Sequence, residues 1–546
     1  MPIKRRRSSV AERVSRPSFK KIRTRDPLDF LSILSDEILI RILHNLPIET
    51  LLLCQQISHR LYMLAGDSQI WKNLYYNRFV LPRALRIPGI KAAQNEALHF
   101  SSQKSRWLGD NSLLNRSDGQ KTNWKRQYKL RHNWAIGACI VQEIHVAAQP
   151  SVPAILVRLA ERIIITADKE EGLRAWDIQE KSLVAQYKLG KGVVPTCLAI
   201  DELDSDKSSL GIAVGFVDGS WNTLRFSVTK GSFSLSFAHP ASSNGSLGAI
   251  AFSKPYLFSI TDGQLLSLYT FGPKPVDLLG KGTEADTLGK KLSVAVTSKG
   301  GNSDTSSIRV EEDARDVSPQ PHLLASLKSH TSWPPLSLSI RSTPTTLIAS
   351  IAYSLPTYLS GYTIGLQELH LSMQTSQITS SRLTTALSDG FQSLRSSAPP
   401  INHLRPTSLS YSHPYILATH PDNTLTFYMC TSTATKLSLS HGTKLWGHTS
   451  CVSSAEITPR GKAVSVSTRG ELRVWDLEGG VSKKKSLDKG EIGSVRVAGA
   501  KRPDGIPEET FTVEEKKQWV GFDDEMVIVL KDSGQGTQAL VVYDFT

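Results

Sequence analysis

The sequence is poor in the residues that build disulfide frameworks and metal centres. Its 546 residues include five cysteines, none in a C-x-x-C pair and none with a histidine at a zinc-like spacing. These spacings argue against a disulfide framework and against a structural metal site, so we expect no metal and no cofactor. We interpret the cysteines as small core residues, namely Cys54, Cys139, Cys197, Cys430 and Cys451.

Long apolar runs and catalytic motifs are also lacking. No run approaches the roughly 20 apolar residues of a membrane-spanning helix, and the N-terminus has no apolar segment of the secretory type. We therefore expect no membrane partner. The sequence contains no Gly-rich phosphate loop, no G-x-S-x-G, no H-E-x-x-H and no distinctive carboxylate pair. These absences favour a protein that is not an enzyme, although a triad that assembles only in space leaves no such signal.

Positive charge is concentrated at the N-terminus. Residues 1–26 hold ten Lys or Arg against two acidic residues, a net charge of +8 out of +14 for the whole chain. Such a segment buries too little apolar surface to fold, so we expect a disordered basic tail over residues 1–30. Two clusters in it resemble a bipartite nuclear-import signal: Lys4, Arg5, Arg6, Arg7, Lys20, Lys21, Arg23 and Arg25.

This signal predicts binding of a nuclear-import receptor and a protein found in both nucleus and cytoplasm. The alternative is a solvated tail that touches phosphate groups non-specifically, and no specific nucleic-acid contact is expected.

The stretch LSDEILIRILHNLP, residues 34–47, predicts a helix of about three turns. Ser35 is suited to the N-cap, Asp36 and Glu37 lie where the helix dipole favours negative charge, and Pro47 prevents propagation. Its apolar residues span about 200° of the helix, roughly twice what one packed face needs. The helix therefore either lies in a core with neighbours on two sides or offers a second face to a partner.

Further short helices follow, with a break and a new N-cap at Gly66-Asp67. About 45 residues in three short helices bury little apolar surface, which favours the docking interpretation. The elements L-S-D-E-I-L, I-L-x-x-L-P, L-L-x-C-x-x-I-S-H-R and L-A-G-D-S-x-x-W-K follow one another over residues 31–79. This order resembles an F-box. It departs from the family where Leu34-Ser35 replaces Leu-Pro and where Leu61 replaces a tryptophan.

The resemblance implies docking to a Skp-type adaptor, which in turn holds a cullin-RING ubiquitin ligase. The residues that we expect to bind the adaptor are Leu34, Ile38, Leu39, Ile42, Leu46, Pro47, Leu51 and Leu52.

Beyond the F-box, a basic segment over residues 122–134 predicts a helix that resembles the linker of F-box proteins of the WD-repeat class. After residue 139, short Val/Ile/Leu/Ser-rich runs alternate with turn residues, which indicates an all-β region. Its clearest unit runs from Gly447-His448 to Trp475-Asp476 and matches a WD repeat in motif and spacing. In this unit Arg469-Gly470 stands where an Asp is usual, and we expect His448 to be structural.

Weaker copies of this unit, including one with His330 at the histidine position, give seven units. They run over about 140–178, 194–228, 247–271, 323–372, 404–429, 445–477 and 494–545. Seven units predict a closed β-propeller whose last blade takes a strand from residues 139–147.

The predicted fold class is α+β multidomain. It comprises a tail over 1–30, a three-helix F-box over 31–82, a linker with a helix over 83–138 and a WD-repeat propeller over 139–546, with disordered loops near 272–320 and 373–402.

The sequence thus predicts a substrate-recruiting adaptor of a cullin-RING E3 ubiquitin ligase, with the client protein on the propeller. Client-binding residues are not identifiable, because the best repeat has Ser453 and Gly470 where the arginines of phosphopeptide-binding relatives would be sought. Two alternatives stay open: a nuclear interaction scaffold without ligase function, and a propeller hydrolase.

Overall fold

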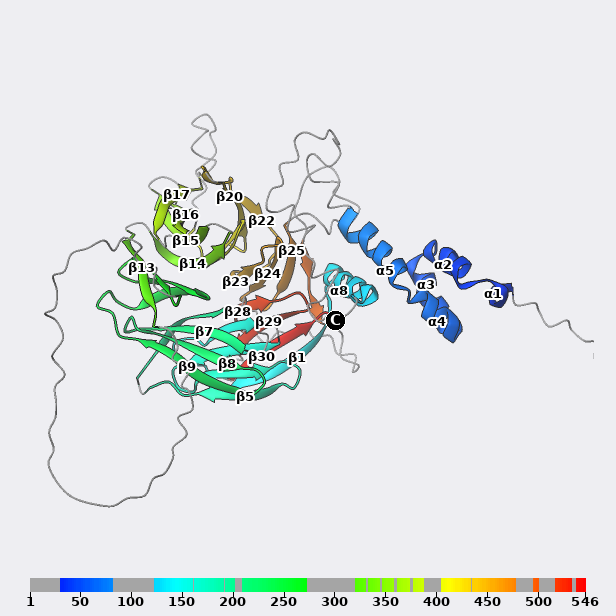
Figure 1. Cartoon of the computed structure of the whole chain (residues 1–546), viewed down its shortest axis with the longest axis horizontal. Helices are drawn as coiled ribbons and strands as arrows, with labels where there is room; N and C mark the ends of the chain where they lie inside the picture. The colour runs from blue at the N-terminus through cyan, green and yellow to red at the C-terminus, as the bar shows by residue number, and fades with distance from the viewer. Residues whose placement is uncertain are drawn as a thin grey trace, which may run out of the picture. The chain divides into compact units, whose positions relative to one another are not determined.

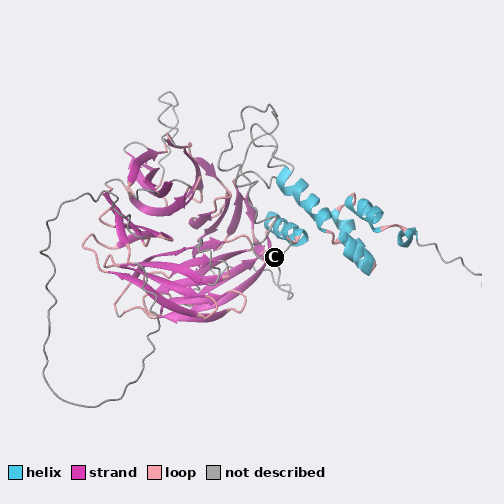
Figure 2. Cartoon of the chain, in the orientation of Figure 1, coloured by secondary structure: helices cyan, strands magenta, loops and turns pink. Residues whose placement is uncertain are grey.

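In the computed structural model the protein consists of an α-helical part and a part made mainly of β-strands (Figure 2). It describes residues 30–81, 122–160, 162–190, 192–201, 209–272, 320–329, 332–343, 346–357, 361–373, 377–386, 404–433, 435–477, 494–499, 516–532 and 537–546. These residues form two compact units, one with 30–81 and 122–128 and one with the described part of 129–546. The basic tail, His330 and most of the two predicted loops lie outside the described residues.

The first unit is built from short helices. They are α1 (Phe30–Ile33), α2 (Asp36–His44), α3 (Ile48–Ile57), α4 (His59–Ala65), α5 (Ser68–Tyr75), the π-helix η1 (Tyr76–Val80) and the first residues of α8 (Trp124–Ile136). The predicted middle helix is divided in two, because Ser58 is extended and its hydroxyl accepts the N–H of Leu61. Asp67 caps α5 as predicted, with its carboxylate accepting the N–H of Gln69 at 2.8 Å.

The second unit contains seven sheets (Figure 1). The first three are β2 (Leu156–Ala160), β3 (Ile163–Asp168), β4 (Gly172–Asp177) and β5 (Ser182–Tyr187); β6 (Pro195–Asp201), β7 (Ser209–Phe216), β8 (Trp221–Ser227) and β9 (Ser232–His239); and β10 (Leu247–Ser253), β11 (Tyr256–Thr261), β12 (Leu265–Thr270) and β13 (His322–Lys328).

The next three sheets follow in chain order. They are β14 (Trp333–Ser342), β15 (Thr346–Thr357), β16 (Gly361–Ser372) and β17 (Ile378–Thr385); β18 (Ser408–Ser412), β19 (Tyr415–Thr419), β20 (Leu425–Ser432) and β21 (Leu437–Leu439), with β22 (Thr443–Leu445) beside β20; and β23 (Val452–Ile457), β24 (Lys462–Ser467), β25 (Leu472–Asp476) and β26 (Ser494–Arg496).

The last sheet closes the ring. Its order is β27 (Ala498–Gly499), β1 (Ala138–Ala147), β30 (Gln538–Asp544), β29 (Met526–Asp532) and β28 (Lys516–Phe522). The innermost strands contact one another in the cyclic order β2, β6, β10, β14, β18, β23, β28 and back to β2. This is a seven-bladed propeller. The prediction that residues 139–147 supply a strand to the last blade is confirmed, because β1 pairs antiparallel with β30.

Other predicted boundaries are wrong. The first blade begins at β2 rather than at about residue 140, because β1 lies in the closing sheet, and β13 pairs with β12 rather than opening the fourth unit. Residues 378–385, predicted as loop, form β17 at the outer edge of the fourth sheet. None of the residues of this Ser/Thr-rich strand is fully buried, so it lacks the apolar run that marks an inner strand.

The predicted structural role of His448 is visible in the sixth blade. Its Nε2 lies 2.6 Å from the Ser465 hydroxyl, which also accepts the indole N–H of Trp475 at 2.8 Å. The sequence has Arg469-Gly470 where the turn aspartate of such a unit is usual. Glu471, one residue further along, supplies the acidic group instead, and its carboxylate accepts a hydrogen bond from the Thr449 N–H. Burial lowers the pKa of His448 to about 4, so this histidine is neutral at pH 7.

We expect the His448 site to make the propeller less stable at mildly acidic pH. A histidine in the unfolded chain titrates near 6.5, so as the pH falls the unfolded state gains a proton before the folded state does. Between pH 7.5 and 5.0 this group should remove about 2 kcal/mol from the free energy of unfolding.

The measurement is thermal or urea unfolding of wild type and His448→Gln at both pH values. Burial raises the pKa of Asp523 to about 6, so protonation of this carboxyl stabilises the folded state as the pH falls. This contribution opposes that of His448, but it is present in both wild type and variant. The difference between them therefore isolates His448, and an identical pH dependence for wild type and variant would contradict the expectation.

Candidate adaptor-docking surface

Helix α2 divides its wide apolar arc between two environments. Leu39 and Leu43 are each 3% exposed and face the core of the helical unit, whereas Ile38 and Ile42 are 48% and 42% exposed. The two isoleucines are four residues apart and therefore lie one turn above the other on the same side of the helix. The second side of this helix is thus an apolar surface that the described residues leave uncovered.

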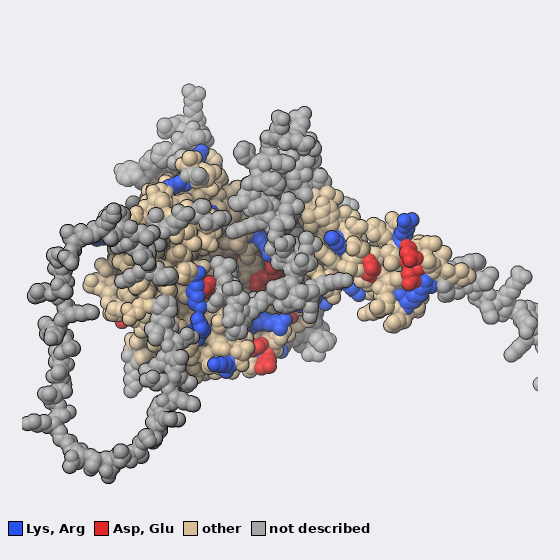
Figure 3. All heavy atoms as spheres, viewed as in Figure 1, with Lys and Arg blue, Asp and Glu red and all other residues tan. Residues whose placement is uncertain are grey.

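Neighbouring helices add to this uncovered apolar surface. Helix α3 buries only Leu51 fully, and α4 buries only Ala65. Figure 3 shows the visible face of the helical unit as mostly uncharged, with a few acidic and basic side chains. The exposed large apolar residues of α1 to α4 are Leu31, Ile33, Ile38, Ile42, Leu52, Leu53, Ile57, Tyr62 and Met63. Large exposed apolar patches are typical of protein-binding surfaces, so this surface is the candidate docking site.

The eight predicted contact residues fall into three groups. Ile38, Ile42, Pro47 and Leu52 are exposed, and Leu34 and Leu46 are half-buried. The prediction is wrong for Leu39 and Leu51, which are 3% and 0% exposed and therefore support the surface from beneath.

Leu53, Ile57, Tyr62 and Met63 were missed by the sequence analysis. The break at Ser58 resets the helical phase between α3 and α4, so no single periodic stripe joins these residues. The sequence signal that would have found them is the density of large apolar residues over 51–63, rather than their spacing.

Beneath this surface lies a small aromatic core. Trp71 is 3% exposed, donates its indole N–H to the Ala65 carbonyl at 2.8 Å and packs edge-on against Tyr128 of α8. Tyr128 also contacts Phe79, with 5.3 Å between ring centroids. The first residues of α8 therefore complete the helical unit, and the aromatic residue Tyr128 of this basic helix packs into its core.

An arginine fixes the start of α2. The Arg60 guanidinium of α4 donates to the Asp36 carboxylate at 2.6 Å and to the Leu34 carbonyl at 2.6 Å. Ser35 occupies the N-cap position but accepts no capping hydrogen bond from the helix. Instead, hydrogen bonds from the Glu37 N–H and from Ser35 lower the pKa of the exposed Glu37 carboxyl, which keeps this end of the surface negatively charged.

One group in the propeller has the composition of a metal site. Ligand atoms of Glu368, His413 and Cys430 lie within 4.8 Å of one another. However, the Glu368 carboxylate already accepts hydrogen bonds from Arg341 at 2.7 Å and from Ser432 at 2.6 Å. Burial raises the pKa of Cys430 to about 12, so this residue is a neutral thiol in the structure. We therefore interpret these residues as a buried polar network.

None of the helices in the described residues is both long and apolar enough to cross a membrane.

Two family models match the sequence. Residues 139–546 match the model described as F-box protein pof12 beta-propeller, and residues 36–77 match the F-box-like model. No curated protein matches the sequence. Among solved structures, the computationally designed Ika8 protein is 13% identical, with a TM-score of 0.35 over 72% of this chain and 83% of that one.

Proposed function

Because this chain belongs to the F-box protein pof12 beta-propeller family and carries an F-box-like domain, we propose that it recruits substrates to a cullin-RING ubiquitin ligase. F-box and propeller domains are non-catalytic adaptor modules, and an F-box implies binding to a Skp-type adaptor. In this proposal the adaptor holds the cullin, the propeller binds the client protein, and the ligase supplies the chemistry.

The uncovered apolar surface of α1 to α4 is the observation that carries this proposal. Full burial of one leucine or isoleucine side chain contributes about 1.5 to 3 kcal/mol. Ile38, Ile42, Leu52, Leu53 and Ile57 are each between 41% and 70% exposed, so much of that free energy is available to a partner. Five partly exposed side chains of this size are enough for a specific interface if they are buried together.

We expect Ile38→Asp with Leu52→Asp to reduce capture of the Skp-type adaptor and cullin at least tenfold. Both side chains are exposed, so the substitutions place charge on the surface without entering the core. The measurement is affinity capture of tagged full-length wild type and variant, scored for adaptor and cullin. Val152→Asp is the matched control, because Val152 is 85% exposed in the propeller unit.

Two outcomes would contradict the proposal. One is that well-folded wild type captures neither adaptor nor cullin, which would favour an interaction scaffold without ligase function. The other is that the double variant captures both as well as wild type does.

Nuclear import stays a prediction. It rests on the two basic clusters, Lys4 to Arg7 and Lys20 to Arg25, which lie outside the described residues. Nuclear accumulation of the full chain beside a chain without residues 1–25 is the measurement that tests it.

A further inference from the structure

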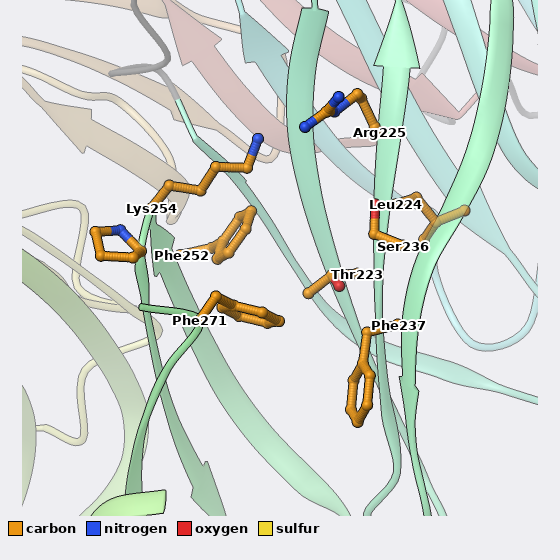
Figure 4. Close-up of a pocket in the computed structure, with 9 residues that line it drawn as sticks. Thr223, Leu224, Arg225, Ser236, Phe237, Phe252, Lys254 and Phe271 are labelled. Carbon is orange, nitrogen blue, oxygen red and sulfur yellow. The ribbon is translucent and has the colours of Figure 1, made fainter. Parts of the chain in front are cut away.

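A pocket lies between the second and third blades of the propeller. Its volume is about 250 Å³, just below the roughly 300 to 1,000 Å³ typical of small-molecule sites, so it suits one large side chain rather than a cofactor. Strands β8 and β9 form one wall, and the β10–β11 turn with the end of β12 forms the other (Figure 4). The residues that define its chemistry are Thr223, Arg225, Phe237, Phe252, Lys254 and Phe271.

Three phenylalanines make the pocket apolar and hold its shape. Phe271 packs edge-on against Phe252 and Phe237, with 6.1 Å and 6.4 Å between ring centroids. Behind them Trp221 is 1% exposed and contacts Phe237 at 5.6 Å. These rings belong to the core between the two blades, so the wall that they form exists before any ligand arrives.

A buried hydroxyl also lines the pocket. Thr223 is 2% exposed, and its Oγ1 has no hydrogen-bond partner among the described residues. A buried hydroxyl without a partner costs free energy, so a ligand that places a hydrogen-bonding group here gains more than contact area.

The mouth of the pocket is positively charged. Arg225 and Lys254 come from opposite walls, and Figure 4 shows the ends of their side chains directed toward one another. Both residues are exposed, and no described acidic side chain forms an ion pair with the Arg225 guanidinium. Lys254 already has an acidic neighbour, because its backbone N–H donates to the buried Asp201 carboxylate at 3.0 Å. Cations that converge beside an aromatic wall favour a ligand with an apolar body and negative charge next to it.

We propose that this pocket binds a tyrosine of the client protein that is flanked by acidic residues. The tyrosine ring lies against the three phenylalanines, its hydroxyl reaches Thr223 Oγ1, and the neighbouring carboxylates contact Arg225. This inference rests on the proposed function in one respect, namely that the propeller recruits a client.

The test is direct peptide binding to the purified full-length chain, without adaptor. The probes are fluorescent peptides with the sequences Gly-Glu-Glu-Tyr-Glu-Glu-Gly and Gly-Lys-Lys-Tyr-Lys-Lys-Gly, followed by anisotropy. We expect the acidic peptide to bind and the basic one not to bind. Arg225→Glu should weaken binding of the acidic peptide about tenfold or more, because a charge-assisted contact becomes a repulsion. Lys230→Glu, the same charge change in the exposed β8–β9 turn, should have no effect.

A second variant tests the hydroxyl. Thr223→Val keeps the shape of the side chain, and thermal unfolding should show that the fold is retained, since no protein partner of the hydroxyl is lost. It should weaken binding of the tyrosine peptide several-fold and leave binding of the same peptide with Phe in place of Tyr unchanged.

Three results would overturn the inference: no binding of the acidic peptide by wild type, equal binding of acidic and basic peptides, or equal losses in Arg225→Glu and Lys230→Glu. Failure here is distinguishable from failure of the proposed function. Adaptor capture by the same preparations measures the helical unit alone, so either result can be positive while the other is negative.

Discussion

A chain without residues 538–546 is expected to lose the compact propeller entirely. This deletion removes β30, which lies between β1 and β29 and is hydrogen-bonded to both. Without it β1 loses its antiparallel partner and the closing blade separates into two parts, so the contact of β28 with β2 is the main link left between the last and first blades.

The energetic size of this deletion is comparable to the stability of a whole domain. Leu540, Val541, Val542, Tyr543 and Phe545 are all less than 9% exposed, and burial of each contributes roughly 1.5 to 3 kcal/mol. Their sum, about 8 to 15 kcal/mol, lies within the range of about 5 to 15 kcal/mol that is typical of the stability of a whole domain. Helix α8 also loses its stacking of Trp134 on Phe545, with 3.9 Å between ring centroids.

Limited proteolysis and near-ultraviolet circular dichroism of wild type and truncated chain measure this effect. We expect rapid cleavage within the propeller and loss of the fixed aromatic signal after truncation. Removal of Thr546 alone is the control, since it loses a long contact of 3.3 Å from Lys129 and the hydrogen bond from the Thr546 N–H to the Asp544 carboxylate at 2.9 Å, but no part of β30. Addition of a synthetic peptide of residues 536–546 should restore part of the signal, and a truncated chain as resistant to protease as wild type would disprove the expectation.

The second large effect is expected for Glu368→Ala. The Glu368 side chain is fully buried on β16 and accepts hydrogen bonds from Arg341 of the same blade and Ser432 of the next. Burial lowers the pKa of His370, its other neighbour, so Arg341 is the cation that balances the carboxylate near neutral pH. Removal of the carboxylate leaves this arginine largely buried without its counter-charge, which costs about 3 to 5 kcal/mol.

Urea unfolding followed by tryptophan fluorescence gives the change in stability. Glu368→Gln should cost less than Glu368→Ala, because the amide oxygen still accepts a hydrogen bond from Arg341. Arg460→Ala provides the comparison with an exposed ion pair. The Arg460 guanidinium lies 3.0 Å from the Asp524 carboxylate, and the two side chains are 46% and 64% exposed. We expect this substitution to lower the free energy of unfolding by about 1 kcal/mol or less. Equal losses for Glu368→Ala and Arg460→Ala would show that the buried network does not stabilise the contact between the fourth and fifth blades.

For the helical unit, the spacing of apolar residues predicted which residues are on the apolar arc of α2 but not which of them are buried. It identified the apolar arc of α2 correctly as wider than one packed face, but it did not separate Leu39 from Ile38. These neighbours differ by about 100° on the helix, and both lie inside the arc. Which of them faces inward is decided by where α3, α4 and α5 pack, and no pattern within one helix contains that information.

In the propeller the sequence predicted the number of blades and the closure but misplaced individual strands. Strand β13 is separated from β12 by about fifty residues, so proximity along the chain assigns it to the wrong neighbour. The acid of the sixth blade was missed for a similar reason. Glu471 stands beyond the turn where an aspartate was sought, and its longer side chain reaches the Thr449 N–H from there.

The pairing of β1 with β30 also has a consequence for synthesis. Ile144 faces Leu540, so at about 5 to 20 residues per second the ribosome makes β30 roughly 20 to 80 s after β1. During that interval β1 is an unpaired edge that can associate with other chains. Its polar residues Gln142, Glu143 and His145 make such association less favourable. Production of folded protein should therefore depend on chaperone supply and on translation speed across the last blade, even though β1 is paired with β30 along its length in the finished ring.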